Sequence, residues 1–145
     1  MRLSLTGSLL KKIQMKSISY TVVFEPFSEK HFIKSFAKKY KGAWDFTLKF
    51  LSQEFEQIDL LFLKNTAETI VDSVEVKICK TEFKIAGTQE SRHGSGNRCI
   101  VAIHKDANKV CILLVYHKND LGGGNETANW KNLIRENYSR YSKII

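Results

Sequence analysis

The sequence predicts an α+β fold, in which an antiparallel sheet packs on an N-terminal helical hairpin and a further helix closes the chain. Three observations support this fold. Short runs rich in β-branched and aromatic residues alternate with turn residues, two successive helical patterns follow the first of these runs, and the chain ends in an amphipathic pattern. A length of 145 residues is enough for one domain with a substantial core. The expected order is β-α-α-β-β-β-α.

The N-terminal half of this domain begins with a strand and continues into two helices. The strand is Tyr20–Phe24, which ends near the only proline. The first helix has apolar residues at i, i+4 and i+8, and we expect Gly42 to end it. In the second helix, apolar residues recur every three or four positions: Trp44, Leu48, Leu51, Phe55 and Ile58. For residues 60–70, a helix extension and a connecting segment both remain open.

The C-terminal half contains the remaining strands and the last helix. Residues 74–85 alternate as one long bent strand or as two short strands. Cys99–Ile103 and Val110–Val115 predict a β-hairpin whose turn places Asn108 in a left-handed conformation. A glycine-rich loop then leads to a helix that begins near Asn125. Its apolar side carries Trp130, Leu133, Ile134, Tyr138 and Tyr141.

We expect residues 18–145 to form this single domain. Residues 1–17 are then an N-terminal tail, or the product of an upstream start codon, with Met15 as the alternative start. No stretch reaches the ~18 apolar residues that a membrane span needs. The three cysteines have no CxxC spacing and the histidines have no i, i+4 pair, so we expect no metal site and no cofactor, and buried thiols that suit the cytoplasm.

The charge of the chain favours a polyanionic partner. The formal net charge is +8 and the pI is about 9.4. Between residues 76 and 118, eight lysines and arginines stand against three acidic residues. This clustering predicts binding to nucleic acid.

If the strand that ends near Ala86 pairs with the strand that starts at Arg98, one edge of the sheet collects basic side chains. These are Lys84, Arg92, His93, Arg98, His117 and Lys118. The sequence places only Glu90 and Asp120 near them, so we expect a phosphate-binding edge poor in carboxylates.

Three stretches of this segment resemble the RelE/ParE superfamily, the toxins of bacterial type II toxin–antitoxin modules. They are Phe83-Lys84-Ile85, Ser95-Gly96-Asn97-Arg98, and Val115-Tyr116-His117-Lys118-Asn119-Asp120-Leu121. The resemblance implies a small curved antiparallel sheet on a helical hairpin, a cytoplasmic location and an antitoxin partner. It also implies an mRNA endoribonuclease that acts at the ribosome and inhibits translation, or a non-catalytic inhibitor of DNA gyrase.

The resemblance assigns roles to individual residues. Lys84 matches the first lysine of the family's Lys-x-Lys pair and Arg98 matches its strand-start arginine, but Ala86 stands where the second lysine would be. Another group must then take the proton of the RNA 2′-OH, or the protein is an attenuated RNA-binding member. We expect His117, with His93 as the competing residue, to move this proton. The residues expected to contact RNA or the ribosome are Arg92, Lys118, Asn119, Lys77 and Lys80.

Overall fold

The structure, a computed structural model, describes residues 19–145. The predicted tail at residues 1–17 and the alternative start at Met15 lie outside this range. In chain order the elements are β1 (Thr21–Phe24), α2 (Pro26–Ser28), a π-helical turn (Glu29–Ile33), α3 (Lys34–Glu56), α4 (Ile58–Leu63), β2 (Ala67–Asp72), β3 (Val76–Phe83), β4 (Asn97–His104), β5 (Lys109–His117), 3₁₀ turns (Lys118–Leu121 and Gly123–Asn125) and α5 (Glu126–Asn137).

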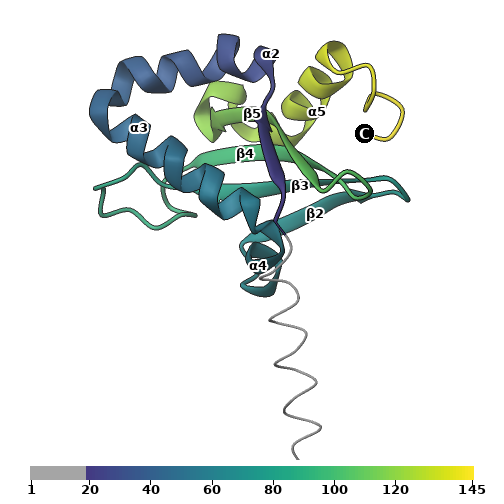
Figure 1. The fold of residues 1–145 in the computed structure, drawn as a ribbon. Coiled ribbons are helices and arrows are strands. Elements are labelled where there is room, and N and C mark those ends of the chain that lie inside the picture. Colours follow the sequence, from purple (N-terminus) through teal and green to yellow (C-terminus); the bar gives the residue numbers. More distant parts are fainter. Residues whose placement is uncertain (1–18) are drawn as a thin grey trace, which may run out of the picture.

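One five-stranded sheet organises the described chain, with the strand order β1-β5-β4-β3-β2 (Figure 1). Strands β2 to β5 form an antiparallel meander, whereas β1 pairs in parallel with β5. Because β1 and β2 lie on opposite edges, the helices between them cross one face of the sheet. None of the helices within residues 19–145 is long and apolar enough to cross a membrane.

The α+β fold and the C-terminal helix are confirmed, but two details of the prediction are wrong. The sheet is mixed, because the parallel partner of β1 is supplied by β5 at the far end of the sequence. The expected order also lacks β2, which together with α4 accounts for most of the segment left open. Strand β2 is an edge strand whose register shifts between Thr69 and Val71, and such a shift interrupts the alternation that identifies a strand.

The expected helical hairpin is confirmed in part. The long helix α3 is divided at Lys41, whose backbone is not helical (φ 22°, ψ −122°), one residue before the glycine expected to end the first helix. Figure 1 shows α3 turning back at its far end, so that its second arm crosses the sheet towards α4. Between Val76 and Phe83 the chain forms one strand rather than two.

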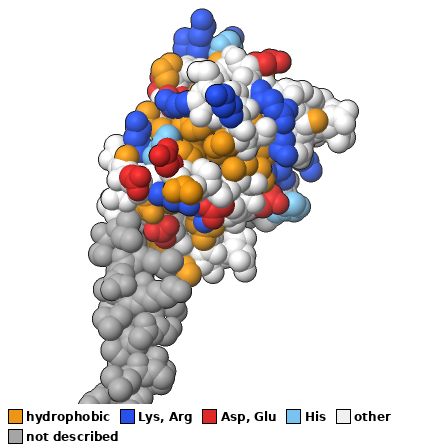
Figure 2. Space-filling model, turned by 90° about the vertical axis from the view of Figure 1, so that its right-hand side faces the viewer, with side chains coloured by type: hydrophobic (Ala, Val, Ile, Leu, Met, Phe, Trp, Pro, Cys, Tyr) orange, Lys and Arg blue, Asp and Glu red, His pale blue; other side chains and the backbone are white. Residues whose placement is uncertain are grey.

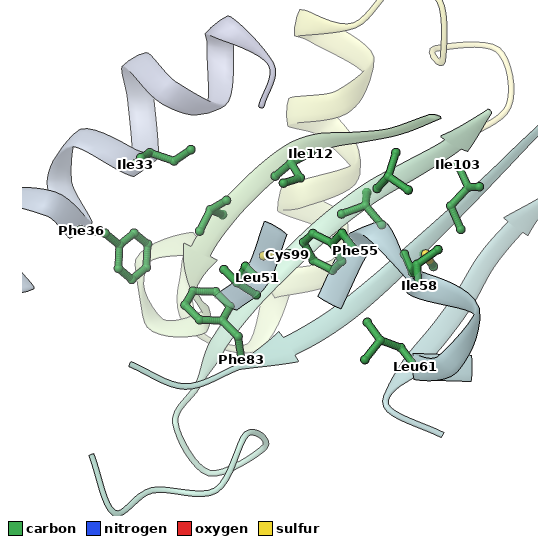
Figure 3. Close-up of a cluster of buried hydrophobic side chains, with 14 of the residues drawn as sticks. Ile33, Phe36, Leu51, Phe55, Ile58, Leu61, Phe83, Cys99, Ile103 and Ile112 are labelled. Carbon is green, nitrogen blue, oxygen red and sulfur yellow. The ribbon is translucent and has the colours of Figure 1, made fainter. Parts of the chain in front are cut away.

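Two hydrophobic clusters cover the two faces of the sheet. On the α3 face, Leu51 and Phe55 of α3 and Ile58 of α4 pack on Phe83, Cys99 and Ile112 from the strands (Figure 3). On the other face, Trp130 and Ile134 of α5 pack with Tyr138 and Tyr141 on Ile100, Leu113 and Leu114. The side of α5 expected to be apolar is therefore its buried side.

A bulge in β5 determines which residues oppose Arg98. At the turn His104 pairs with Lys109, and Asn108 has the expected left-handed conformation (φ 47°). This register alone would place Val115 opposite Arg98. The register shifts by one residue at Leu113, so that Arg98 pairs with Tyr116. The bulge therefore decides that Tyr116, and not Val115, lies opposite Arg98.

Candidate functional site

Arg98 is the central residue of the site. It is the second residue of β4, between Glu82 of β3 and Tyr116 of β5, and only 3% of its surface is exposed. Its guanidinium donates to the carbonyl oxygens of Asn97 at 3.1 Å and His93 at 3.4 Å, and lies 3.2 Å from Glu82 Oε2. Burying a charge is costly unless it is paired, and these contacts supply the pairing.

His93 lies above Arg98 in the loop between β3 and β4. Its Nδ1 is 2.6 Å from Glu82 Oε2, and its side chain is 82% exposed. One carboxylate oxygen therefore contacts both Arg98 and His93. A carboxylate on Nδ1 fixes the orientation of an imidazole and leaves Nε2 directed away from it.

The loop that holds His93 is fixed by its own hydrogen bonds. The Ser95 hydroxyl donates to the carbonyl of Phe83 at 2.5 Å and accepts from the backbone N–H of Asn97 at 3.0 Å. The N–H groups of Gly94, Ser95 and Gly96 donate to Ser91 and His93. These donors are engaged within the loop itself, so the loop is a tight turn that positions His93.

A second polar network borders Arg98 on the α5 side. Glu126 Oε2 lies 2.9 Å from Lys80 Nζ and accepts from the Tyr116 hydroxyl at 2.7 Å. Burial, followed by this hydrogen bond, raises the pKa of Tyr116 far above its ordinary value. Burial also acts to raise the pKa of Glu126, but the hydrogen bonds from Lys80 and Tyr116 outweigh it and keep that pKa below 4.5. Tyr116 is thus a neutral donor to an ionised carboxylate.

These groups line a hollow of about 520 Å³, which we call the polar pocket. It is lined by Asn65, Thr66, Ala67, Glu68, Lys80, Glu82, His93, Arg98, Lys118 and Glu126. Three of these residues are basic and three are acidic, besides His93. The expectation of an edge poor in carboxylates is therefore wrong. Glu82 lies opposite Arg98 on the neighbouring strand β3, and Glu126 is brought to the site by α5. Strand pairing and helix packing, which short sequence motifs do not reveal, therefore place these two carboxylates in the pocket.

Mixed charge is also visible on the wider surface. Figure 2 shows lysine and arginine side chains around a central hydrophobic area, with acidic side chains interspersed among them. On this face, basic and acidic side chains therefore lie among one another and do not form one uniformly basic patch.

The predicted site residues fall into separate groups. Arg98, His93, Lys80 and Lys118 line the polar pocket. Lys84 and Arg92 instead line a second hollow beside α3, where Arg92 forms a two-pronged ion pair with Glu54 at 2.8 and 2.9 Å. The structure therefore separates Lys84 from Arg98.

His117, Asn119 and Lys77 lie outside both groups. His117 Nδ1 accepts from the backbone N–H of Asn119 at 3.1 Å, and its ring packs against Gly96. When His117 is neutral, this bond places its proton on Nε2. The Nζ atom of Lys77 lies 3.9 Å from the ring centroid of Phe62, which belongs to α4.

No cluster of three or more His, Cys, Asp or Glu side chains within residues 19–145 is placed to hold a metal ion. The three cysteines are buried as free thiols, and burial raises the pKa of Cys79 to about 12. At neutral pH these groups are inert apolar side chains.

No protein-family model and no curated protein matches this chain. A comparison with solved structures finds a chain of the archaeal RelE–RelB complex from Pyrococcus horikoshii OT3. The two chains are 13% identical with a TM-score of 0.47, and the match covers 68% of this chain and 94% of that chain. At this level of similarity, neither an activity nor a partner is transferred from that protein.

Proposed function

We propose that this protein is the toxin of a type II toxin–antitoxin module and cleaves mRNA at the ribosome. The observation that carries the proposal is the polar pocket, in which the buried Arg98 lies beside a carboxylate–histidine pair and two lysines. The sequence motifs that resemble the RelE/ParE superfamily supply the substrate class. The pocket supplies groups suited to phosphate binding and proton transfer.

In the proposed reaction the RNA provides its own nucleophile. The 2′-oxygen forms a bond to the adjacent phosphorus, the bond from phosphorus to the 5′-oxygen breaks, and the products carry a 2′,3′-cyclic phosphate and a 5′-hydroxyl. The proton of the 2′-OH passes to His93 Nε2, while Glu82 holds Nδ1. Arg98 stabilises the charge that develops on the phosphorane oxygens, for which its planar donors are suited.

The leaving 5′-oxygen must gain a proton. We assign this step to His117, the sequence-based candidate for proton transfer, acting as an imidazolium cation, because a neutral imidazole is too weak an acid to protonate an alkoxide leaving group. Lys80 and Lys118 contribute positive charge along the pocket. Asn119 and Lys77 remain proposed contacts for RNA or the ribosome. Lys84, the catalytic lysine that the resemblance implies, and Arg92 line the other hollow and take no part in the proposed reaction.

The test compares ribosome-dependent cleavage by the wild type, Arg98→Ala and Arg98→Lys. We expect Arg98→Ala to lose ~10²–10³-fold in single-turnover rate, the scale of one preorganised donor. Arg98→Lys should restore little, because a point charge does not reproduce the guanidinium fork. The matched control is Arg135→Ala, an exposed arginine on α5. Cleavage by Arg98→Ala at the wild-type rate, with normal circular dichroism, would contradict the proposed site.

The second function that the resemblance implies is a non-catalytic inhibitor of DNA gyrase. Two observations argue against catalysis and so favour this alternative: Ala86 stands where the family has its second lysine, and Arg98 and Lys80 are both paired with carboxylates, as in a purely structural cluster. If expression arrests growth while mRNA stays intact and DNA supercoiling changes, this second function is correct.

A further inference from the structure

A second hollow lies on the opposite face of the sheet from the polar pocket. It measures about 530 Å³ and is lined by Phe46, Thr47, Phe50, Leu51, Glu54, Phe83, Lys84, Ala86 and Arg92. Most of these side chains are apolar. We call this hollow the α3 groove.

Two phenylalanines border the α3 groove, and most of the surface of each side chain is exposed to solvent. Phe46 is 72% exposed and Phe50 is 61% exposed, although both belong to a helix whose other side is buried through Trp44, Leu51 and Phe55. Residues four apart in a helix lie on the same side, so the two rings form a pair. Exposed aromatic rings beside an apolar hollow are typical of protein-binding surfaces.

The groove continues along the helices. A smaller hollow of about 190 Å³ shares Phe50 and Glu54 with it and extends to Leu60, Leu61 and Lys64. From Phe46 to Glu56 the backbone of α3 rises by roughly 15 Å, which is nearly three helical turns. The combined hollow therefore has the length of a short amphipathic helix.

The charges around the groove indicate an acidic occupant. Lys49, Lys64 and Lys84 are exposed, and none of them forms an ion pair within residues 19–145. The first arm of α3 adds Lys34, Lys38, Lys39 and Lys41 with no acidic residue between them. The carboxylate of Glu54 inside the groove is already held by Arg92. Two acidic side chains are also exposed nearby, Asp45 on α3 and Glu90 in the loop between Ala86 and Arg92, but the exposed lysines outnumber them.

We propose that the α3 groove binds an amphipathic helix of a partner protein, with large apolar side chains seated beside Phe46 and Phe50 and acidic residues facing the lysines. The groove itself is independent of the reaction. Only the identity of the partner rests on the proposed function, because for a toxin this helix belongs to the antitoxin. The partner then binds on the sheet face opposite Arg98. Arg92 connects the α3 groove with the polar pocket, because its Nε donates to the backbone carbonyl of Glu82 at 3.0 Å.

The experiment uses the full chain and two synthetic helical peptides. Both carry leucines at i, i+3, i+4 and i+7, and their polar sides carry either glutamate or lysine. By fluorescence anisotropy we expect the glutamate peptide to bind with a Kd on the order of 10⁻⁵ M or tighter at low salt. The lysine peptide should bind at least ~10-fold more weakly, because its charge repels the surrounding lysines.

Three variants locate the binding. Phe46→Ser and Phe50→Ser should each weaken binding of the glutamate peptide by ~10-fold or more, as expected for anchor residues. Val74→Ser removes an equally exposed apolar residue from the turn between β2 and β3 and should leave binding unchanged. Circular dichroism confirms that each variant is folded.

Several results would contradict the proposed binding of a helix in the α3 groove. Equal binding of both peptides, no binding of either, or wild-type binding by Phe50→Ser would overturn the proposal. A concentration-dependent dimer in light scattering that Phe50→Ser dissociates would instead identify a second copy of this chain as the occupant. The proposed function fails separately, through the absence of growth arrest, and that result leaves the peptide measurements unaffected.

Discussion

At the scale of single residues, one carboxylate organises the candidate site. Glu82 faces Arg98 across the β3–β4 pair and holds Nδ1 of His93 with the same oxygen. In the proposed reaction we therefore use His93 as the base, whereas the sequence analysis favours His117. The difference arises because the two histidines make different bonds: His93 with a carboxylate and His117 with a backbone N–H.

The first prediction separates these two histidines. His93→Ala should reduce the single-turnover cleavage rate by ~10²–10⁴-fold, the range for a general acid or base, and remove the rise of the rate with pH. His117→Ala should remove the fall of the rate at high pH. The pH–rate profiles of both variants, measured with saturating ribosomes, test this assignment. An unchanged profile for His93→Ala would return the base role to His117.

The second prediction concerns Gly96, which has a φ of +78° and lies against the His117 ring. A Cβ atom at this position would lie 2.5 Å from His117 Nε2. Gly96→Ala should therefore destabilise the protein by about 2 kcal/mol or more, through backbone strain together with the clash. In a His117→Ala background the loss should be smaller, because only the strain remains. Urea unfolding of the four proteins in this cycle measures the difference, and equal losses in both backgrounds would contradict the clash.

At the scale of elements, the segment after α5 is fastened to the sheet by specific hydrogen bonds. The Tyr141 hydroxyl lies 2.7 Å from Nε2 of His104 at the end of β4. The Tyr138 hydroxyl donates to the backbone carbonyl of Leu113 in β5 at 2.7 Å. Burial, assisted by the nearby Lys109, lowers the pKa of His104 below 6.5. The folded state therefore favours neutral His104.

The third prediction follows from this lowered pKa. The unfolded chain binds the His104 proton at a higher pH than the folded chain, so the stabilisation is fully present above pH 6.5 and is lost as the pH falls towards the lowered value. Between about pH 7.5 and about pH 5.5 the wild type should lose more unfolding free energy than His104→Gln, which keeps an acceptor for Tyr141 but does not titrate. Identical pH dependences for the two proteins in urea unfolding would show that His104 is not responsible.

At the scale of the whole molecule, the positive charge and the two hollows suggest separate tasks. The polar pocket and the α3 groove lie on opposite faces of the sheet, so one surface is available to RNA while the other is available to a protein. The lysines of α3 add long-range attraction for an acidic partner.

The fourth prediction is that the acidic product of an adjacent antitoxin gene binds the full chain with a Kd on the order of 10⁻⁹ M at low ionic strength. Because the attraction is partly electrostatic, binding should weaken as salt rises. Isothermal calorimetry at two salt concentrations measures both effects. The absence of binding at either salt concentration would contradict the toxin assignment.

The sequence by itself determined the elements whose pattern is local. The α+β class, the β4–β5 hairpin with its left-handed Asn108 and the inward side of α5 were predictable, because each depends on periodicity or on turn chemistry within a short segment. Of the six basic residues expected at one edge of the sheet, His93, Arg98 and Lys118 line the polar pocket, and the other three do not.

Only the tertiary structure decided which distant residues meet. The parallel pairing of β1 with β5, the position of β2 on the far edge and the delivery of Glu126 by α5 all join segments that are far apart in sequence. The separation of Lys84 from Arg98 likewise depends on the face of the sheet that each side chain reaches. Such contacts are selected by the burial of two apolar faces and by the neutralisation of buried charge, and these energies depend on the whole packed chain rather than on any local pattern.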